Sequence, residues 1–140
     1  MNNHYLLDSW ALLAWLYEEE PASNRIEQLL LDAVELRVQL MLSVINMGEV
    51  YYIFGRARGD ASADQLITHL KKLPIQILPV DESKVLMAGH YKMNHAISYA
   101  DAFAVAEAKE RNAILLTGDP ELFLLGDEIE IERLSRANLR

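Results

Sequence analysis

The sequence predicts an α/β fold with three layers, α/β/α, in which helices cover both faces of a central parallel sheet of about five strands. Short apolar runs alternate with longer segments of helical periodicity along the whole chain, and this is the pattern of strand–helix–strand units. Right-handed crossovers connect the strands of such units. No linker, repeat or low-complexity segment interrupts the 140 residues, so we expect one domain over 1–140.

The first strand is expected over 5–7, where an apolar run ends abruptly at Asp8 and Ser9. A helix over 10–17 follows, and because it is apolar almost all round, its tryptophans are expected in the core. Asp8 then stands at the carboxyl end of a central strand, the edge at which open parallel sheets bind ligands. Taken alone, Asp8 or Ser9 is better explained as a cap of the following helix.

The next helix is expected after Pro21, with Ser23 or Asn24 as its N-cap. Its expected apolar stripe consists of Ile26, Leu29, Leu30 and Val34. A short apolar strand over 39–43 then leads directly into a helix over 44–58.

Asn46 and Glu49 lie one turn apart in the helix over 44–58 and therefore share a face. The apolar stripe on another face consists of Met47, Val50, Tyr51 and Phe54. A polar pair on an exposed helix face is common, and this is the simpler interpretation. The functional alternative is that Glu49 leans over the same crevice as Asp8.

Ser62 is expected to open the following helix, which Pro74 ends. A strand over 75–79 lies between two prolines, which suit a strand's ends or a sheet edge. Asp81 is expected to cap a helix over 82–93. Its expected buried or closely packed positions are Val85, Leu86, Gly89 and Met93. Two lone histidines, His90 and His95, are interpreted as structural or exposed.

Ser98 and Asp101 precede an alanine-rich helix over 102–111, which can pack closely on its neighbours. A buried strand over 113–117 then ends in a tight turn, where Asp119 can cap a helix that begins at Pro120. Glutamate and isoleucine alternate over 128–132, which predicts a half-exposed edge strand.

In this topology Asp8 and Asp119 project from one edge of the sheet, and Asp101 lies at a helix start that faces it. Each acid alone could be a helix cap. Carboxylates that converge within a few ångströms repel one another unless a cation is present, however. Mg²⁺ or Mn²⁺ is the natural partner, because hard divalent ions prefer oxygen ligands.

The charge and cysteine content of the chain exclude several classes of function and site. The formal net charge of −8 argues against binding nucleic acid mainly through a basic surface. Pairs such as Arg56 with Arg58 are interpreted as solvated helix ends. The absence of cysteine excludes disulfides and thiolate metal sites and suits a reducing cytoplasm. The N-terminal apolar run is too short to span a membrane and is unlike a signal peptide.

Four motifs in this order resemble the PIN domain, in particular the VapC-like toxins of bacterial and archaeal toxin–antitoxin pairs. The resemblance covers essentially the whole chain. The motifs are Asp8-Ser9 after a buried strand, Ser43-x-x-Asn46-x-x-Glu49, Ser98-x-x-Asp101-Ala102, and Leu116-Thr117-Gly118-Asp119.

The resemblance implies a Mg²⁺- or Mn²⁺-dependent endoribonuclease that hydrolyses RNA phosphodiester bonds by metal-activated water. Asp8, Glu49 and Asp101 match the family's acidic triad, and Asp119 matches its fourth acidic position. The matching supporting positions are Ser9, Asn46 and Thr117. It further implies a structured RNA substrate such as tRNA, a cognate antitoxin protein, a homodimer and a cytoplasmic location.

Two rival functions stay open: a catalytically silent PIN-like module, and a phosphotransfer protein of the phosphatase or receiver type. A catalytically silent PIN-like module that binds RNA or protein should lack one of the acids, and all four are present. A phosphatase of the haloacid type would need a second aspartate where Trp10 stands. A receiver-type phosphotransfer protein would need an early pair of adjacent acids and a lysine after the last buried strand, and the sequence has neither.

Overall fold

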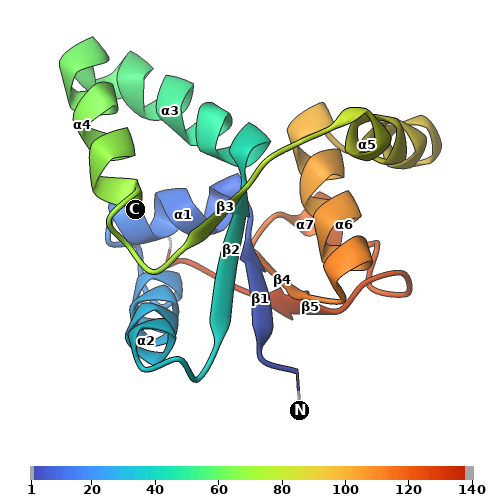
Figure 1. Cartoon of the computed structure of the whole chain (residues 1–140), viewed down its shortest axis with the longest axis horizontal. Helices are drawn as coiled ribbons and strands as arrows, with labels where there is room; N and C mark the ends of the chain where they lie inside the picture. The colour runs from blue at the N-terminus through green and yellow to red at the C-terminus, as the bar shows by residue number, and fades with distance from the viewer. Residues whose placement is uncertain (1, 138–140) are drawn as a thin grey trace.

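The computed structural model describes residues 2–137 and contains a five-stranded parallel sheet in the order β3-β2-β1-β4-β5 (Figure 1). The strands are β1 (His4–Leu7), β2 (Gln39–Ser43), β3 (Gln76–Leu78), β4 (Ile114–Thr117) and β5 (Ile131–Arg133). The α/β prediction with a parallel sheet is therefore confirmed. Strand β3 lies at the edge of the sheet, one of the two places that its flanking prolines suit.

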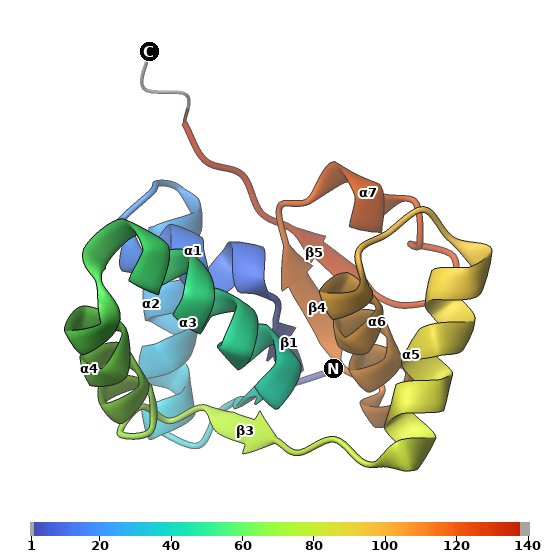
Figure 2. The same ribbon diagram turned by 90° about the horizontal axis from the view of Figure 1, so that it is seen from above.

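Seven helices connect and cover the strands within residues 2–137 (Figures 1 and 2). They are α1 (Ser9–Leu16), α2 (Ala22–Val34), α3 (Val44–Arg58), α4 (Asp60–Leu70), α5 (Glu82–Asn94), α6 (Tyr99–Arg111) and α7 (Pro120–Phe123). Within this part of the chain, no helix is long and apolar enough to cross a bilayer.

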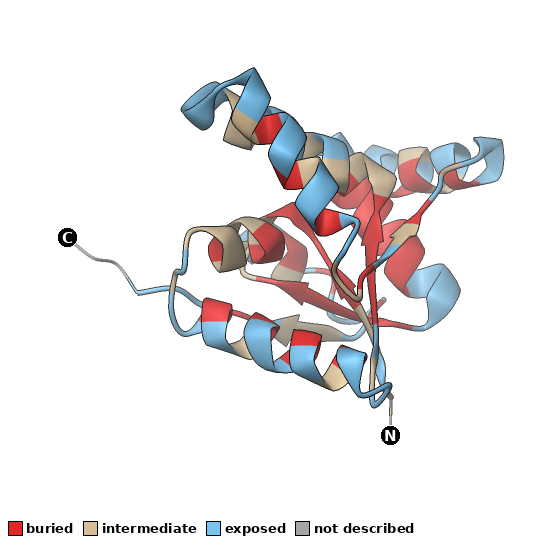
Figure 3. Cartoon of the chain, turned by 60° about the vertical axis from the view of Figure 1, so that its left-hand side comes forward, coloured by how far each residue is buried: buried red, intermediate tan, exposed pale blue. Residues whose placement is uncertain are grey.

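Two hydrophobic cores form because successive strand residues point to opposite faces of the sheet. Leu6 of β1 packs with α5, α6 and α7, whereas its neighbour Leu7 packs with α1, α2, α3 and α4. Both leucines are fully buried, and each contributes about 1.5–3 kcal/mol to folding. Figure 3 shows this arrangement as buried strands between helices whose outer sides are exposed.

The alanine-rich helix α6 is the most deeply buried helix of the core that contains Leu6. Residues 101–108 are all buried, and Phe103 among them is one of the largest fully buried side chains. The alanines permit this close packing because a methyl group keeps the helix axis near the sheet and near α5. The helix begins at Tyr99, three residues before the predicted start.

Two helices begin earlier than predicted. Helix α2 begins at Ala22 with Pro21 at the N-cap, so Ser23 and Asn24 lie inside it. The Asn24 N–H donates a hydrogen bond to the Glu20 carboxylate at 2.8 Å. Helix α4 begins at Asp60 rather than Ser62, because Gly59 adopts φ 91° and ends α3 there.

Four apolar residues are less buried than predicted. The expected stripe residues Val34 and Tyr51 are exposed, and both tryptophans are only half-buried.

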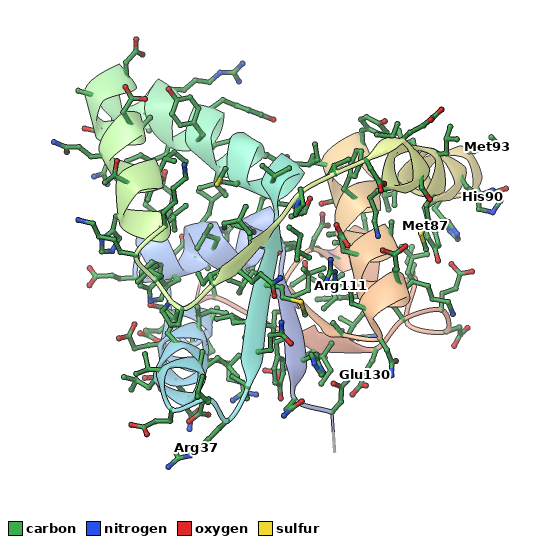
Figure 4. The ribbon with its side chains drawn as sticks, viewed as in Figure 1. Arg37, Met87, His90, Met93, Arg111 and Glu130 are labelled. Atoms are coloured by element: carbon green, nitrogen blue, oxygen red, sulfur yellow. The ribbon has the colours of Figure 1, made fainter. Side chains whose placement is uncertain are left out.

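Helix α5 buries a face that the sequence did not predict. Of the four expected buried residues, Val85, Leu86 and Met93 are exposed, and Gly89 is half-buried. The buried residues are Lys84, Ala88 and Tyr91. Figure 4 shows Met93 and His90 at the outer end of this helix, directed away from the body of the protein.

The last strand is shorter than predicted. Residues 128 and 129 belong to a turn in which the Glu128 and Ile129 N–H groups donate to the Leu125 carbonyl, at 2.9 and 3.2 Å. Strand β5 itself begins at Ile131. Its position at the sheet edge agrees with the prediction.

Candidate metal centre

Polar residues gather where the parallel strands end, on the edge that faces the viewer in Figure 2. Asp8 follows β1 and caps α1, Ser43 ends β2 and caps α3, and Asp119 follows β4 and caps α7. Helix α6 begins beside them with Ser98 as its N-cap. The N-termini of four helices at one edge create a positive potential that favours bound acids.

Asp8 is 1% exposed, and its two carboxylate oxygens have different surroundings. Oδ1 accepts a hydrogen bond from the Ala11 N–H at 2.8 Å, which is the predicted helix cap. Oδ2 is buried and has no hydrogen-bond partner in residues 2–137. Capping thus accounts for one oxygen, and a proton, a water molecule or a cation can satisfy the other.

Burial raises the pKa of Asp8 from 3.8 to about 7. The Thr117 hydroxyl and the Ala11 N–H act in the opposite direction, because they stabilise the carboxylate. The charges of Asp101 and Asp119 raise the pKa of Asp8 further. These three acids are therefore close enough to influence one another electrostatically.

Asp101, Asp119 and Glu121 each place one carboxylate oxygen within 4.8 Å of the others. Asp101 is buried in the first turn of α6, Asp119 is half-buried, and Glu121 is exposed in the first turn of α7. Burial raises the pKa of Asp101 to about 7, and the neighbouring Asp119 carboxyl and the Glu49 charge add to this rise, whereas the Ser98 hydroxyl opposes it. Three oxygens at this spacing are close enough together to coordinate one divalent ion.

Glu121 is the acid that sequence reasoning missed. It stands two residues after Asp119, inside a four-residue helix, and its only sequence signal was an acid in the first turn after an Asp-Pro cap. That position is common for a surface glutamate at any helix start.

Glu49 lies outside this three-acid group but beside it. The Ser9 hydroxyl donates a short hydrogen bond to Glu49 Oε1, and Asn46 Nδ2 donates to Ser9 Oγ at 3.2 Å and to the Ala100 carbonyl at 3.3 Å. This network connects α1, α3 and α6. The simpler interpretation of an exposed polar pair is wrong for Asn46, which is fully buried because α3 packs against α6 at this point.

Thr117 interacts with both acids that follow the central strands, Asp8 and Asp119. It is fully buried, its Oγ1 accepts a hydrogen bond from the Asp119 N–H at 3.0 Å, and its hydroxyl lowers the pKa of Asp8. The side chain thereby fixes the backbone of the Thr117–Asp119 turn next to Asp8.

The sequence profile of the PIN domain matches residues 5–127. The chain belongs to the PIN domain family. A comparison with curated proteins finds no match for its sequence.

Solved structures with the same fold are VapC-like toxins. VapBC2 from Rickettsia felis, bound to a DNA fragment from its promoter, aligns with TM-score 0.71 and 15% identity over 94% of this chain and 99% of that chain. VapC20 from Mycobacterium tuberculosis, a toxin that cleaves the sarcin-ricin loop, aligns with TM-score 0.70 and 14% identity over 87% and 95% of the two chains. A toxin–antitoxin complex from Klebsiella pneumoniae aligns with TM-score 0.62 and 14% identity over 84% and 89%. At this identity the likeness establishes the VapC-like fold.

Gly118 of this PIN domain lies directly under Trp10. A Cβ atom at residue 118 would stand 2.2 Å from Cζ2 of the indole, well inside any permitted contact. Glycine is therefore required for the Thr117–Asp119 turn to pass beneath this ring.

We expect Gly118→Ala to lower the free energy of unfolding by about 1–3 kcal/mol, the usual cost of overpacking. The matched control is Gly89→Ala in α5, where no atom lies within 4 Å of the new Cβ; removing a helical glycine should stabilise by about 0.5–1 kcal/mol. Urea denaturation of both variants measures the difference. A Gly118→Ala protein as stable as the wild-type chain would show that the indole moves aside at no cost.

Proposed function

We propose that this PIN domain is a metal-dependent endoribonuclease that hydrolyses RNA phosphodiester bonds, and that it acts as the toxin of a toxin–antitoxin pair. The observation that carries the proposal is the cluster of Asp101, Asp119 and Glu121 oxygens within 4.8 Å. The buried Oδ2 of Asp8, which has no hydrogen-bond partner among residues 2–137, supports it, since the charges of Asp101 and Asp119 act on this carboxyl. Buried acids without a partner suit a site that is completed by a cation.

The residues fit Mg²⁺ or Mn²⁺. All the donors are carboxylate oxygens, which hard divalent ions prefer, and no lysine or arginine forms an ion pair with any of these acids within residues 2–137. We assign Asp8, Asp101 and Asp119 as ligands, with Glu49 completing the site directly or through water. Glu121 is a further carboxylate at the solvent side of the cluster.

When bound, such an ion stabilises the negative charge that develops on the phosphate during cleavage and makes water a better nucleophile at neutral pH. The protein's own groups prepare the site for it. Thr117 fixes the backbone that carries Asp119, and Ser9 holds Glu49 in place. Asn46 ties α3 to the start of α6, which keeps Glu49 facing Asp101.

Two relatives support a proposal for the biological setting. Because the Klebsiella pneumoniae structure is a toxin–antitoxin complex, we propose a cognate antitoxin as protein partner. VapC20 cleaves the sarcin-ricin loop, so we propose a structured RNA, possible examples being tRNA and ribosomal RNA, as substrate. A homodimer and a cytoplasmic site of action belong to the same proposal.

The test is cleavage of purified tRNA by the chain in the presence of Mn²⁺ or EDTA. We expect cleavage with Mn²⁺ only, and a loss of about 100-fold or more in Asp8→Asn, since the metal contributes several kcal/mol to the transition state. Asparagine keeps the oxygen that caps α1, so the fold should persist.

Asp127→Asn is the matched control, because it removes an exposed carboxylate outside the cluster. Expression of the wild-type chain in a bacterial host should slow growth, and expression of Asp8→Asn should not. Equal cleavage by the wild-type chain and Asp8→Asn would contradict the proposal.

A further inference from the structure

Two arginines stand on opposite sides of the Thr117–Asp119 turn. Arg133 ends β5 and pairs with Thr117 in the sheet register, and its Cζ lies 4.7 Å from the ring centroid of Phe123 in α7. Arg136 has its Cζ 5.2 Å from the ring of Trp10, the ring that covers Gly118.

The two arginines lie on different faces of the sheet, Arg133 by the alternation of β5 and Arg136 by its contact with Trp10. Glu132 bonds to Arg25 of α2, at 2.7 and 2.9 Å, so its neighbour Arg133 belongs to the opposite face, with α6 and α7. Trp10 packs against the core beneath α1 and α2, and Arg136 lies on that side.

Each guanidinium group lies over an aromatic ring. The segment that carries Arg136 is fixed by hydrogen bonds from the Ala22 N–H to the Ser135 carbonyl, at 3.0 Å, and from the Ala137 N–H to the Glu20 carbonyl, at 2.7 Å. A guanidinium that lies on an aromatic ring keeps its N–H edge available for an anion.

The two arginines differ in whether a neighbouring carboxylate neutralises their charge. Arg136 Nη1 pairs with Glu19 at 3.0 Å, which occupies only part of its five-donor edge. Arg133 is exposed and forms no ion pair with any carboxylate in residues 2–137. Arg133, without a paired carboxylate among the described residues, therefore lies at the strand end that leads to Asp119 and against the helix that carries Glu121.

An RNA strand needs such cations at this place. The protein has a net charge of −8, and the acid cluster itself repels phosphates, so contacts to the backbone must come from local basic groups. Arginine suits this role because its planar fork binds a phosphate through two parallel hydrogen bonds.

We propose that Arg133 and Arg136 bind successive phosphates of a single RNA strand that crosses the Thr117–Asp119 turn. The inference rests on the proposed nuclease function and names the residues that hold its substrate. The strand then passes between β5 and α7 on one side and Trp10 on the other, which places one of its phosphodiester bonds over the acids.

The test measures binding of a fluorescein-labelled single-stranded RNA oligonucleotide by anisotropy, in Mg²⁺ and over a range of KCl. The Asp8→Asn chain is used so that the strand stays intact. Each phosphate contact to a single strand contributes about 0.7 to the slope of log K against log salt. Arg133→Gln and Arg136→Gln should each reduce the slope by about 0.7, and the double variant by about 1.4.

Arg37→Gln is the matched control, since it removes the same charge from an exposed arginine at the opposite end of the sheet (Figure 4), and its slope should equal that of the parent. Arg133→Lys should restore the slope, which a loss of packing on Phe123 would not predict. An unchanged slope in the double variant, or no binding by the parent, overturns the inference.

Cleavage by chains with intact Asp8 separates this inference from the nuclease proposal. Each glutamine variant should raise KM about tenfold, the effect of losing one charge-assisted hydrogen bond, and leave kcat unchanged, because such a contact is the same in ground and transition states. Unchanged KM in both variants overturns the inference while the nuclease stands. Absence of cleavage by the wild-type chain overturns the nuclease, and the anisotropy slopes then still decide whether these arginines bind RNA.

Discussion

Asp101→Asn is expected to reduce Mn²⁺-dependent RNA cleavage by about 100-fold or more while leaving the metal-free protein as stable as before, or more stable. Asp101 is buried among repelling carboxylates, and this repulsion contributes to its pKa of about 7. A neutral amide relieves the repulsion but is a much poorer ligand for a hard cation. The loss of several kcal/mol of transition-state stabilisation then appears in the rate.

Ser98→Ala is the matched control, because it tests the capping role that the same motif suggests. The Ser98 hydroxyl accepts a hydrogen bond from the Asp101 N–H at 3.1 Å. Alanine removes this cap and should cost about 1 kcal/mol, with most of the cleavage retained. Chemical denaturation in EDTA and cleavage in Mn²⁺ measure both variants. An Asp101→Asn protein that is destabilised yet cleaves normally would make Asp101 an ordinary helix residue.

The strands of the sheet centre could be predicted because burial on both faces leaves a plain sequence signal. Residues 114–117 are buried without exception, and a run of that kind is readable from hydrophobicity alone. The edge strand β5 was harder. The alternation of Ile129 and Ile131 resembles that of a strand. Ile129 lies in a turn after α7, however, and is buried there. The same alternation of apolar residues can therefore arise in a strand or in a turn followed by a strand.

Helix α5 shows where local pattern fails. Hydrophobicity alone placed Leu86 and Met93 in the core, whereas the structure buries Lys84. Lys84 Nζ pairs with the buried Glu107 of α6 at 3.0 Å, and a lysine is tolerated inside a protein only with such a partner. The partner lies on another helix, so no pattern within α5 could reveal which face turns inward.

The acids of the candidate site were easier to predict than their surroundings. Parallel topology alone brings Asp8 and Asp119 to one edge of the sheet, because both follow central strands. The burial of Asn46 depends on how α3 packs on α6, and the proximity of Glu121 depends on the short helix α7. Both are tertiary facts that residue spacing does not contain.

Metal-free protein is expected to lose stability as the pH rises from about 4 to about 7, the reverse of usual acid denaturation. The pKa of Asp8 and of Asp101 is about 7 in the folded protein and 3.8 as the ordinary value. Between these values the folded state binds more protons than the unfolded state, so the slope of stability against pH is negative. The contribution is fully present below pH 3.8 and is lost as the pH passes through about 7.

Mn²⁺ binding should show the opposite dependence on pH, because the ion must displace these protons from its ligands. Below about pH 7 the affinity should rise by between about tenfold and 100-fold per pH unit, as one or two protons are released, and it should level off above that pH. The rise in melting temperature at a fixed Mn²⁺ concentration should therefore be large at about pH 8 and small at about pH 5. In Asp8→Asn, one titrating group is gone, so both dependences become shallower. Thermal melts with Mn²⁺ and with EDTA across this pH range measure both effects, and a Mn²⁺ stabilisation that is equal at all pH values would show that neither Asp8 nor Asp101 gives up a proton to the metal.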